Sequence, residues 1–267
     1  MDWQLLGWLA VALYLAAEIL SIASLRKPRF PALAPYALAG GIVLQFIDLH
    51  ARARALGSVP YRTLSGSMSL FGWMLAVTCL VLLLKHRERS IGPFLIPFVV
   101  IFSVAGVLIP FRPTPPRPET SGALFALHVT LAILGYAAFA LSFVLSLLYL
   151  VQSRQIRRAQ TGVLFARLPA LEAIGGMNRT AVSIGLVSLL VSTLLGAAWA
   201  ERVWNSLGDA KLAWAIFTLA VYGLLLWMDR RGWKGQRVAL LSILGFGLVI
   251  FSYTFVNLYL SRAHTFR

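Results

Sequence analysis

The sequence predicts an all-α fold, a polytopic membrane bundle of about eight transmembrane helices. Two properties of the 267-residue chain point to it: 59% of the residues are hydrophobic, and only 12% carry a charge. Soluble domains hold about twice that share of charged residues. The third property is the grouping of the apolar residues into runs of roughly 20, the length that crosses a hydrocarbon core.

Eight apolar runs are the candidates for spanning helices, and no polar stretch between them is long enough for a separate soluble domain. We therefore expect a single integral membrane domain over residues 1–267. Pro169 is placed to begin a short surface helix that ends at Gly175 and Gly176, and Asn178 to cap the helix that follows. The runs are 3–25, 31–49, 67–84, 91–110, 122–151, 180–200, 212–228 and 238–260.

The connections between the runs predict the orientation. Basic residues gather after the first, third, fifth and seventh runs, and cytoplasmic loops are the ones enriched in Lys and Arg. Both termini are therefore expected outside, in the periplasm of a bacterium, with the protein in the inner membrane; three Arg in the outer loop 52–62 are an exception. The clusters hold 15 of the 24 basic residues: Arg26, Lys27, Arg29, Lys85, Arg87, Arg89, Arg154, Arg157, Arg158, Arg167, Arg179, Arg230, Arg231, Lys234 and Arg237.

The basic residues behind the net charge of +15 are thus grouped in a way that indicates membrane topology. A soluble protein with this charge would suggest nucleic acid as a partner. Here the basic residues sit in short clusters between apolar runs, so we expect the lipid bilayer as a partner and no nucleic acid.

Three of the four histidines fall on the outer side in this topology. His50 lies at the outer end of the second run, His128 lies six residues into the fifth, and His264 lies just beyond the eighth. Only His86 falls on the cytoplasmic side, within a charged cluster. Two neutral imidazoles on opposite faces can hold a heme iron, so the outer histidines are candidate metal ligands.

Tryptophans close to these histidines in the predicted topology are candidates for the flat bed that heme needs. Trp199 and Trp204 precede the seventh run, and Arg202, Lys211 or Arg262 could meet the propionates. The alternative is structural: Trp residues gather at membrane surfaces as anchors, and a histidine at a helix end commonly forms a hydrogen bond there.

Acidic residues within the predicted spans are the next candidates. Glu18 lies in the first run and Asp48 in the second, and ionisable groups inside a membrane are costly and often functional. A transporter or channel that uses them is one hypothesis. Alternatively, Asp48 pairs with Arg52 on one helix face if the second helix extends that far. Asp209 is placed to cap the seventh helix.

Motifs for catalysis are absent from the sequence. It contains no nucleophile elbow, phosphate loop, metalloprotease histidine pair or Cys-x-x-Cys, and its one cysteine is Cys79. We therefore expect a protein that is not an enzyme.

Four passages in the second half form a pattern whose order is informative. The first is His128-Val-Thr-Leu-Ala-Ile-Leu-Gly-Tyr-Ala-Ala, and the second is Leu168-Pro-Ala-Leu-Glu. The third is Gly196-Ala-Ala-Trp-Ala followed by Trp204 and Asp209-Ala-Lys. The fourth is Gly232-Trp-Lys-Gly-Gln-Arg, continuing to Val256-Asn-Leu and His264. Together they resemble the cytochrome c assembly family, heme-handling membrane proteins that include CcsA, CcmC and HemX-like proteins.

The resemblance is strongest over 122–265 and extends weakly back to His50. It implies that His128 and His264 ligate heme iron, that Trp199, Trp204 and Asp209 lie near the heme, and that His50 is a further heme-site residue. It also implies a role in cytochrome c maturation or heme homeostasis, with other cytochrome c assembly proteins as partners.

The segment 201–211, called the tryptophan loop below, departs from the family pattern. It is two residues shorter, and two Trp, one Pro and one Glu of the family pattern are missing. A family histidine at the end of the next helix corresponds to Trp227. The chain is therefore most similar to the reduced YpjD-like and HemX-like branch. The alternative function is a heme-free regulatory or scaffold membrane protein for heme biosynthesis or respiratory assembly.

Overall fold

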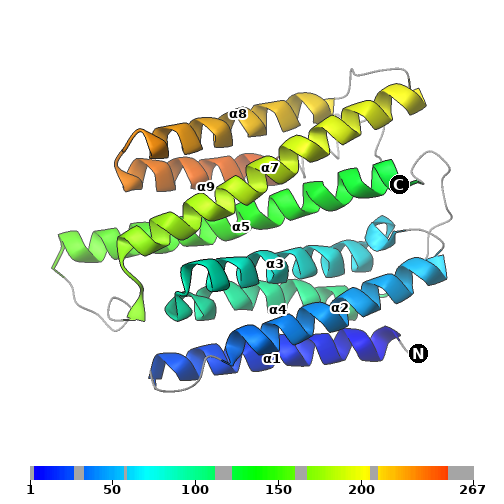
Figure 1. Cartoon of the computed structure of the whole chain (residues 1–267), viewed down its shortest axis with the longest axis horizontal. Helices are drawn as coiled ribbons and strands as arrows, with labels where there is room; N and C mark the ends of the chain where they lie inside the picture. Colours follow the sequence, from blue (N-terminus) through cyan, green and yellow to red (C-terminus); the bar gives the residue numbers. More distant parts are fainter. Residues whose placement is uncertain are drawn as a thin grey trace. The chain divides into compact units, whose positions relative to one another are not determined.

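The computed structural model describes residues 3–26, 33–56, 59–111, 122–159, 167–204 and 210–251, and the secondary structure of these residues is entirely helical (Figure 1). They form eight α-helices and two short 3-10 helices. Six of the helices are long and apolar enough to cross a membrane. The all-α prediction is confirmed, whereas eight spans and outer termini stay predictions.

The described helices belong to two compact units. In the first, α1 and α3 each pack against α2 and α4, so that the four helices close into a bundle (Figure 1). The helices of this unit are α1 (Trp3–Arg26), α2 (Ala34–Leu56), α3 (Leu64–His86) and α4 (Gly92–Leu108), with the 3-10 helices η1 (Pro60–Arg62) and η2 (Arg89–Ile91) before α3 and α4.

Local signals in the sequence set the bounds of α3 and its distance from α4. The Thr63 hydroxyl caps α3 by accepting the Gly66 N–H at 3.0 Å, which satisfies one of the donors at the helix start. Gly72 and Gly106 allow the two helices to approach closely, because a Cβ on either would lie 2.7 Å from an atom of the facing helix. Small residues serve this purpose in membrane helix pairs.

The second unit is built on two long helices and a helical hairpin. Its helices are α5 (Ala123–Arg157), α7 (Leu171–Trp204), α8 (Ala210–Arg230) and α9 (Gly235–Phe251), although the last turn of α5 and the start of α7 belong to the first unit. Phe139 of α5 stacks on Tyr222 of α8, with ring centroids 3.6 Å apart. Val182 and Val238 pack in the same core, which therefore joins all four helices.

One sequence prediction about α7 is wrong. The helix runs unbroken from Leu171 through Gly175 and Gly176, so no separate surface helix ends there and Asn178 caps nothing. Asn178 is buried inside the helix, where its Oδ1 accepts the Ser142 hydroxyl at 2.6 Å. Packing against α5 therefore outweighs the local tendency of the two glycines to end a helix.

The second helix also differs from its predicted bounds. α2 begins at Ala34 and continues to Leu56, so Arg52, expected in an outer loop, lies in the same helix as His50. The grouping into two compact units concerns packing alone, and the single membrane domain over 1–267 stays a prediction.

Candidate functional site

His128 lies in the second turn of α5, half-buried and facing α7. Its Nδ1 is 2.7 Å from the Ser192 carbonyl oxygen and 3.1 Å from the Ser192 hydroxyl. A carbonyl oxygen only accepts hydrogen bonds, so Nδ1 carries the proton and donates it. In the neutral ring the lone pair then lies on Nε2.

The Ser192 hydroxyl completes a reciprocal contact between α5 and α7. It donates to the His128 carbonyl oxygen at 2.7 Å, across the same helix pair. The two residues are therefore joined through backbone and side chain at once. Histidines that bind a metal characteristically donate their other ring N–H to a carbonyl or carboxylate, which fixes the tautomer and the ring orientation.

Gly196, one turn after Ser192, provides the space for the imidazole. A Cβ on Gly196 would lie 2.5 Å from both Cε1 and Nδ1 of His128. The ring therefore rests directly on the α7 backbone, between the Ser192 carbonyl and a position without a side chain. Any larger residue at 196 would displace the ring from its hydrogen bond.

Two buried aromatic residues line the same end of the helix pair. Phe125, one turn before His128, has its ring centroid 6.1 Å from that of His128 and 4.6 Å from that of Trp199. Phe125 is 4% exposed and Trp199 is 5% exposed. Trp199 thus packs on Phe125, beside His128, at this end of the α5–α7 pair. We call His128, Ser192, Gly196, Phe125 and Trp199 the His128 cluster.

The other predicted site residues are not joined to this cluster by the structure. Trp204 is the last residue of α7, and its side chain lies outside the described part, as do Asp209 and His264. His50 is exposed on α2 of the first unit, where its ring stacks on Phe46 at 6.3 Å between centroids. The roles of all four in a heme site stay predictions.

Ser192 and Gly196 are the members that sequence reasoning missed as partners of His128. A signal for them exists, because Ser188, Ser192 and Gly196 recur at four-residue spacing and so share one helix face. Small residues on one face of a membrane helix mark the side where another helix packs closely. The spacing indicates the contact face, although it does not identify His128 as the partner.

The His128 cluster contains one histidine that could ligate a heme iron. Among the described residues, no group of three or more His, Cys, Asp or Glu side chains could hold a metal ion. A porphyrin brings four nitrogen ligands of its own, so the protein needs to supply one or two axial ligands. A histidine whose tautomer is set by a backbone carbonyl fits that requirement.

The predicted pairing of Asp48 with Arg52 is confirmed in the first unit. Arg52 Nε donates to Asp48 Oδ1 at 2.9 Å, and the two side chains are 1% and 0% exposed. Arg52 Nη1 also donates to the Ser65 hydroxyl of α3 at 3.0 Å. Its guanidinium lies 4.8 Å from the ring centroid of Trp3 in α1, and Ser65 donates to the Gly106 carbonyl of α4 at 2.7 Å. The pair therefore connects four helices.

Most of the chain matches one protein family. Residues 61–264 match the family described as Cytochrome C assembly protein. This range contains all of the His128 cluster and begins after His50. Six apolar helices, together with this match, indicate a multi-pass membrane protein whose outer helix surfaces contact lipid.

Individual relatives carry two kinds of name. The chain is 31% identical to Protein HemX of Brevibacillus brevis over 70% of each chain. It is 28% identical to Protein HemX of Bacillus subtilis (strain 168), over 79% of this chain and 78% of the relative. It is 26% identical to Cytochrome c biogenesis protein CcsA of Synechococcus sp. (strain JA-2-3B'a(2-13)), over 99% of this chain and 95% of the relative.

Proposed function

We propose a heme-holding function for this chain, which belongs to the cytochrome c assembly protein family. It would bind heme at the outer face of a bacterial inner membrane and present it to a partner. The biological step is cytochrome c maturation, because relatives bear the name Cytochrome c biogenesis protein CcsA, or the related part of heme homeostasis that the family resemblance implies. In this proposal the eight helical segments span the membrane and both termini lie outside.

One observation carries the proposal: the hydrogen bond from His128 Nδ1 to the Ser192 carbonyl. It holds the ring in one orientation and puts the lone pair of the neutral imidazole on Nε2, the nitrogen that we propose as the iron ligand. Gly196 supports the same orientation by letting the ring rest on α7. Loss of these contacts should weaken heme binding, since the hydrogen-bond partners of metal ligands contribute strongly to metal affinity.

The remaining residues of the proposed site come from the family resemblance. His264 would be the other ligand of the heme iron, and Trp199, Trp204, Asp209 and His50 would be the further residues that hold the heme. Bound heme supplies a redox-active iron whose potential depends on its axial ligands. The protein itself orients the heme and shields one side of it, with no catalytic group of its own, so we propose a binding and presenting protein and not an enzyme.

The test is the heme absorbance of the protein purified from heme-replete cells. A Soret band is expected in the wild type, and the variant in which His128→Ala and His264→Ala are combined should lose it. His86→Ala is the matched control, because His86 ends α3 in the first unit. A wild type without a Soret band, or a double variant with the wild-type band, would refute the assignment of these ligands.

A second function is favoured by a different observation, the shortened tryptophan loop together with Trp227 at the position of a family histidine. A protein that had lost heme would act as a regulatory or scaffold protein in heme biosynthesis or respiratory assembly. Crosslinking in cells separates the two functions. Specific cytoplasmic partners, recovered with a protein that holds no heme, would support the scaffold and overturn heme binding.

A further inference from the structure

The turn between α8 and α9 carries a concentrated positive charge. Within eight residues lie Arg230, Arg231, Lys234 and Arg237, all exposed. The acidic residue beside them, Asp229, accepts a hydrogen bond from Arg179 of α7 and is thereby engaged. Within the part of the chain that the structure describes, none of the four cations forms an ion pair, so their charge is available to an external anion.

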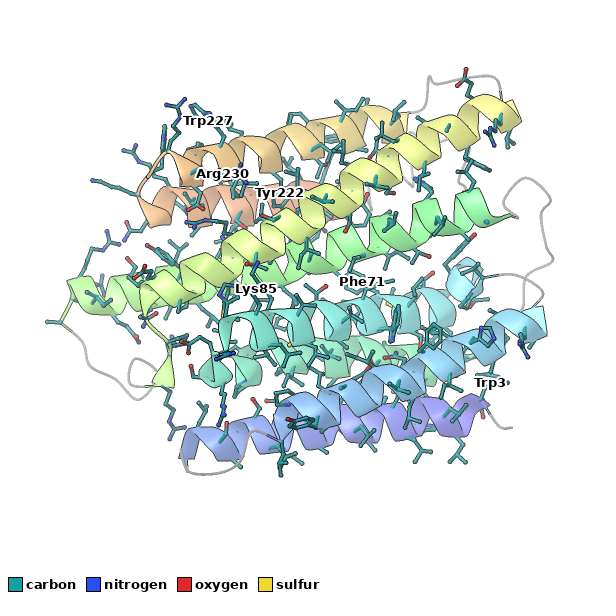
Figure 2. All side chains as sticks on the ribbon, in the orientation of Figure 1. Trp3, Phe71, Lys85, Tyr222, Trp227 and Arg230 are labelled. Carbon is teal, nitrogen blue, oxygen red and sulfur yellow. The ribbon has the colours of Figure 1, made fainter. Side chains whose placement is uncertain are left out.

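Two of these cations are stacked on exposed tryptophans. The Arg231 guanidinium lies 5.2 Å from the ring centroid of Trp227, and that of Arg237 lies 5.5 Å from the ring centroid of Trp233. Trp227 is 51% exposed and Trp233 is 42% exposed. Figure 2 shows Trp227 and Arg230 at the same end of α8. A guanidinium on an indole face keeps its N–H groups directed outward while the ring holds it in place.

The backbone of the turn fixes these pairs. Gly232 adopts a φ of 73°, a left-handed conformation that favours glycine and ends α8. The Trp233 N–H then donates to the Met228 carbonyl at 3.2 Å, and the Arg231 N–H donates to that of Trp227 at 3.0 Å. These bonds close the turn at Gly232, which separates the Trp227–Arg231 pair from the Trp233–Arg237 pair.

The position of the turn at the end of α8 determines which region of the membrane it contacts. The span 212–230 of α8 is apolar and long enough to cross a membrane, so the turn lies where the headgroups lie. Leu224 is exposed one turn before Trp227, and Leu240 is exposed one turn after Arg237. Because residues three apart share a helix face, Leu224 lies on the face of Trp227 and Leu240 lies on the face of Arg237.

We propose that the α8–α9 turn is a binding site for an anionic phospholipid. The guanidinium groups of Arg231 and Arg237 bind the headgroup phosphate, with Lys234 adding charge between them. Trp227 and Trp233 lie at the depth of the glycerol backbone, where tryptophan is enriched in membrane proteins. The acyl chains follow Leu224 and Leu240. This site belongs to the surface of one leaflet and is independent of heme.

The experiment uses the full chain, delipidated in mild detergent, with phosphatidylglycerol or phosphatidylcholine of identical acyl chains. Native mass spectrometry counts the bound lipid at each concentration. A basic residue near an anionic surface contributes about fivefold to binding, so loss of two should weaken phosphatidylglycerol binding roughly 25-fold at low salt. Binding should also fall as ionic strength rises.

The variant that tests the site combines Arg231→Gln with Arg237→Gln. Its matched control combines Arg154→Gln with Arg158→Gln, which removes the same charge from exposed positions at the end of α5. We expect the first variant to lose phosphatidylglycerol and the control to retain it. Equal loss in the control would overturn the site, because the effect would then come from net charge alone.

Two further outcomes decide the question without any variant. A wild type that binds phosphatidylcholine as tightly as phosphatidylglycerol would overturn the proposal. So would displacement of phosphatidylglycerol by millimolar glycerol 3-phosphate, since the site would then recognise a soluble phosphate and not a lipid. Preference for phosphatidylglycerol that survives this competitor supports the lipid site.

Discussion

Gly196→Ala is the substitution most directly tied to the proposed heme site. The added Cβ would lie 2.5 Å from Cε1 and Nδ1 of His128 and 3.2 Å from Nε2. Carbon atoms in contact normally stay about 3.5–4 Å apart, so the ring must withdraw from α7 by about 1 Å. Its Nδ1, now 2.7 Å from the Ser192 carbonyl oxygen, then passes out of hydrogen-bonding range.

Two costs follow from that displacement. The His128 Nδ1–H, left without its acceptor, costs about 1–3 kcal/mol of stability, and overpacking adds about 1–3 kcal/mol. Nε2, the proposed iron ligand, also moves by about the same 1 Å, and the ring loses the hydrogen bond that fixes its tautomer. Loss of such an outer partner typically reduces metal affinity by about 10–100-fold.

Heme titration of the purified protein measures the effect, with the Soret absorbance followed against heme concentration. Gly196→Ala should weaken heme binding by about 10–100-fold and lower the unfolding temperature. Gly223→Ala is the control, because a Cβ at this position in α8 meets no described atom within 4 Å. That variant should bind heme normally, with helix propensity adding up to about 1 kcal/mol of stability. Wild-type heme affinity in Gly196→Ala would refute the packing of His128 against α7 as the source of its orientation.

Three smaller predictions concern other polar contacts. Ser192→Ala keeps the carbonyl that accepts from His128 but removes the hydroxyl. Heme titration should therefore show a loss of affinity well below that of Gly196→Ala, and thermal unfolding a stability loss of about 1 kcal/mol. A loss of heme affinity equal to that of Gly196→Ala would contradict the dominant role of the carbonyl. Arg52→Met leaves Asp48 buried and unpaired and should lower the free energy of unfolding by about 3–5 kcal/mol, measured by thermal unfolding. Adding Asp48→Asn to it should restore part of this stability. An unchanged stability in Arg52→Met would contradict a neutralising role for the pair. Arg179→Gln breaks an ion pair whose arginine is 53% exposed, so the same assay should show a change of at most about 1 kcal/mol, and a larger one would indicate a structural role for the pair.

Sequence reasoning predicts most of the helices of this fold and one buried ion pair. Apolar runs of helix length identify the helices, and four-residue spacing identifies the pairing of Asp48 with Arg52. The continuity of α7 could not be obtained in this way. Gly175 and Gly176 have the local signature of a helix end, and only the buried contact of Asn178 with Ser142 shows that the helix continues.

Part of the candidate site was equally inaccessible to sequence reasoning. The place of His128 in a predicted span and the family resemblance both predict it as a site residue. Its partner was not recognised, since Ser192 acts mainly through a backbone carbonyl, a group that every residue carries. Which carbonyl meets the ring depends on the rotation of α7 against α5. Periodicity within one helix does not contain that information.

The pair formed by Asp48 and Arg52 has a consequence for how the protein enters its membrane. Each charge placed alone at the centre of a spanning helix opposes insertion by about 2.5–3.5 kcal/mol. Both residues belong to α2, which is not among the six helices that qualify as spans by length and composition. Because the partners lie one turn apart, the pair forms as soon as α2 becomes helical, before α3 or α4 has been synthesised. A membrane-spanning α2, as proposed above, would therefore carry its two charges as a neutral pair of its own, and Ser65 and Gly106 complete the network from α3 and α4.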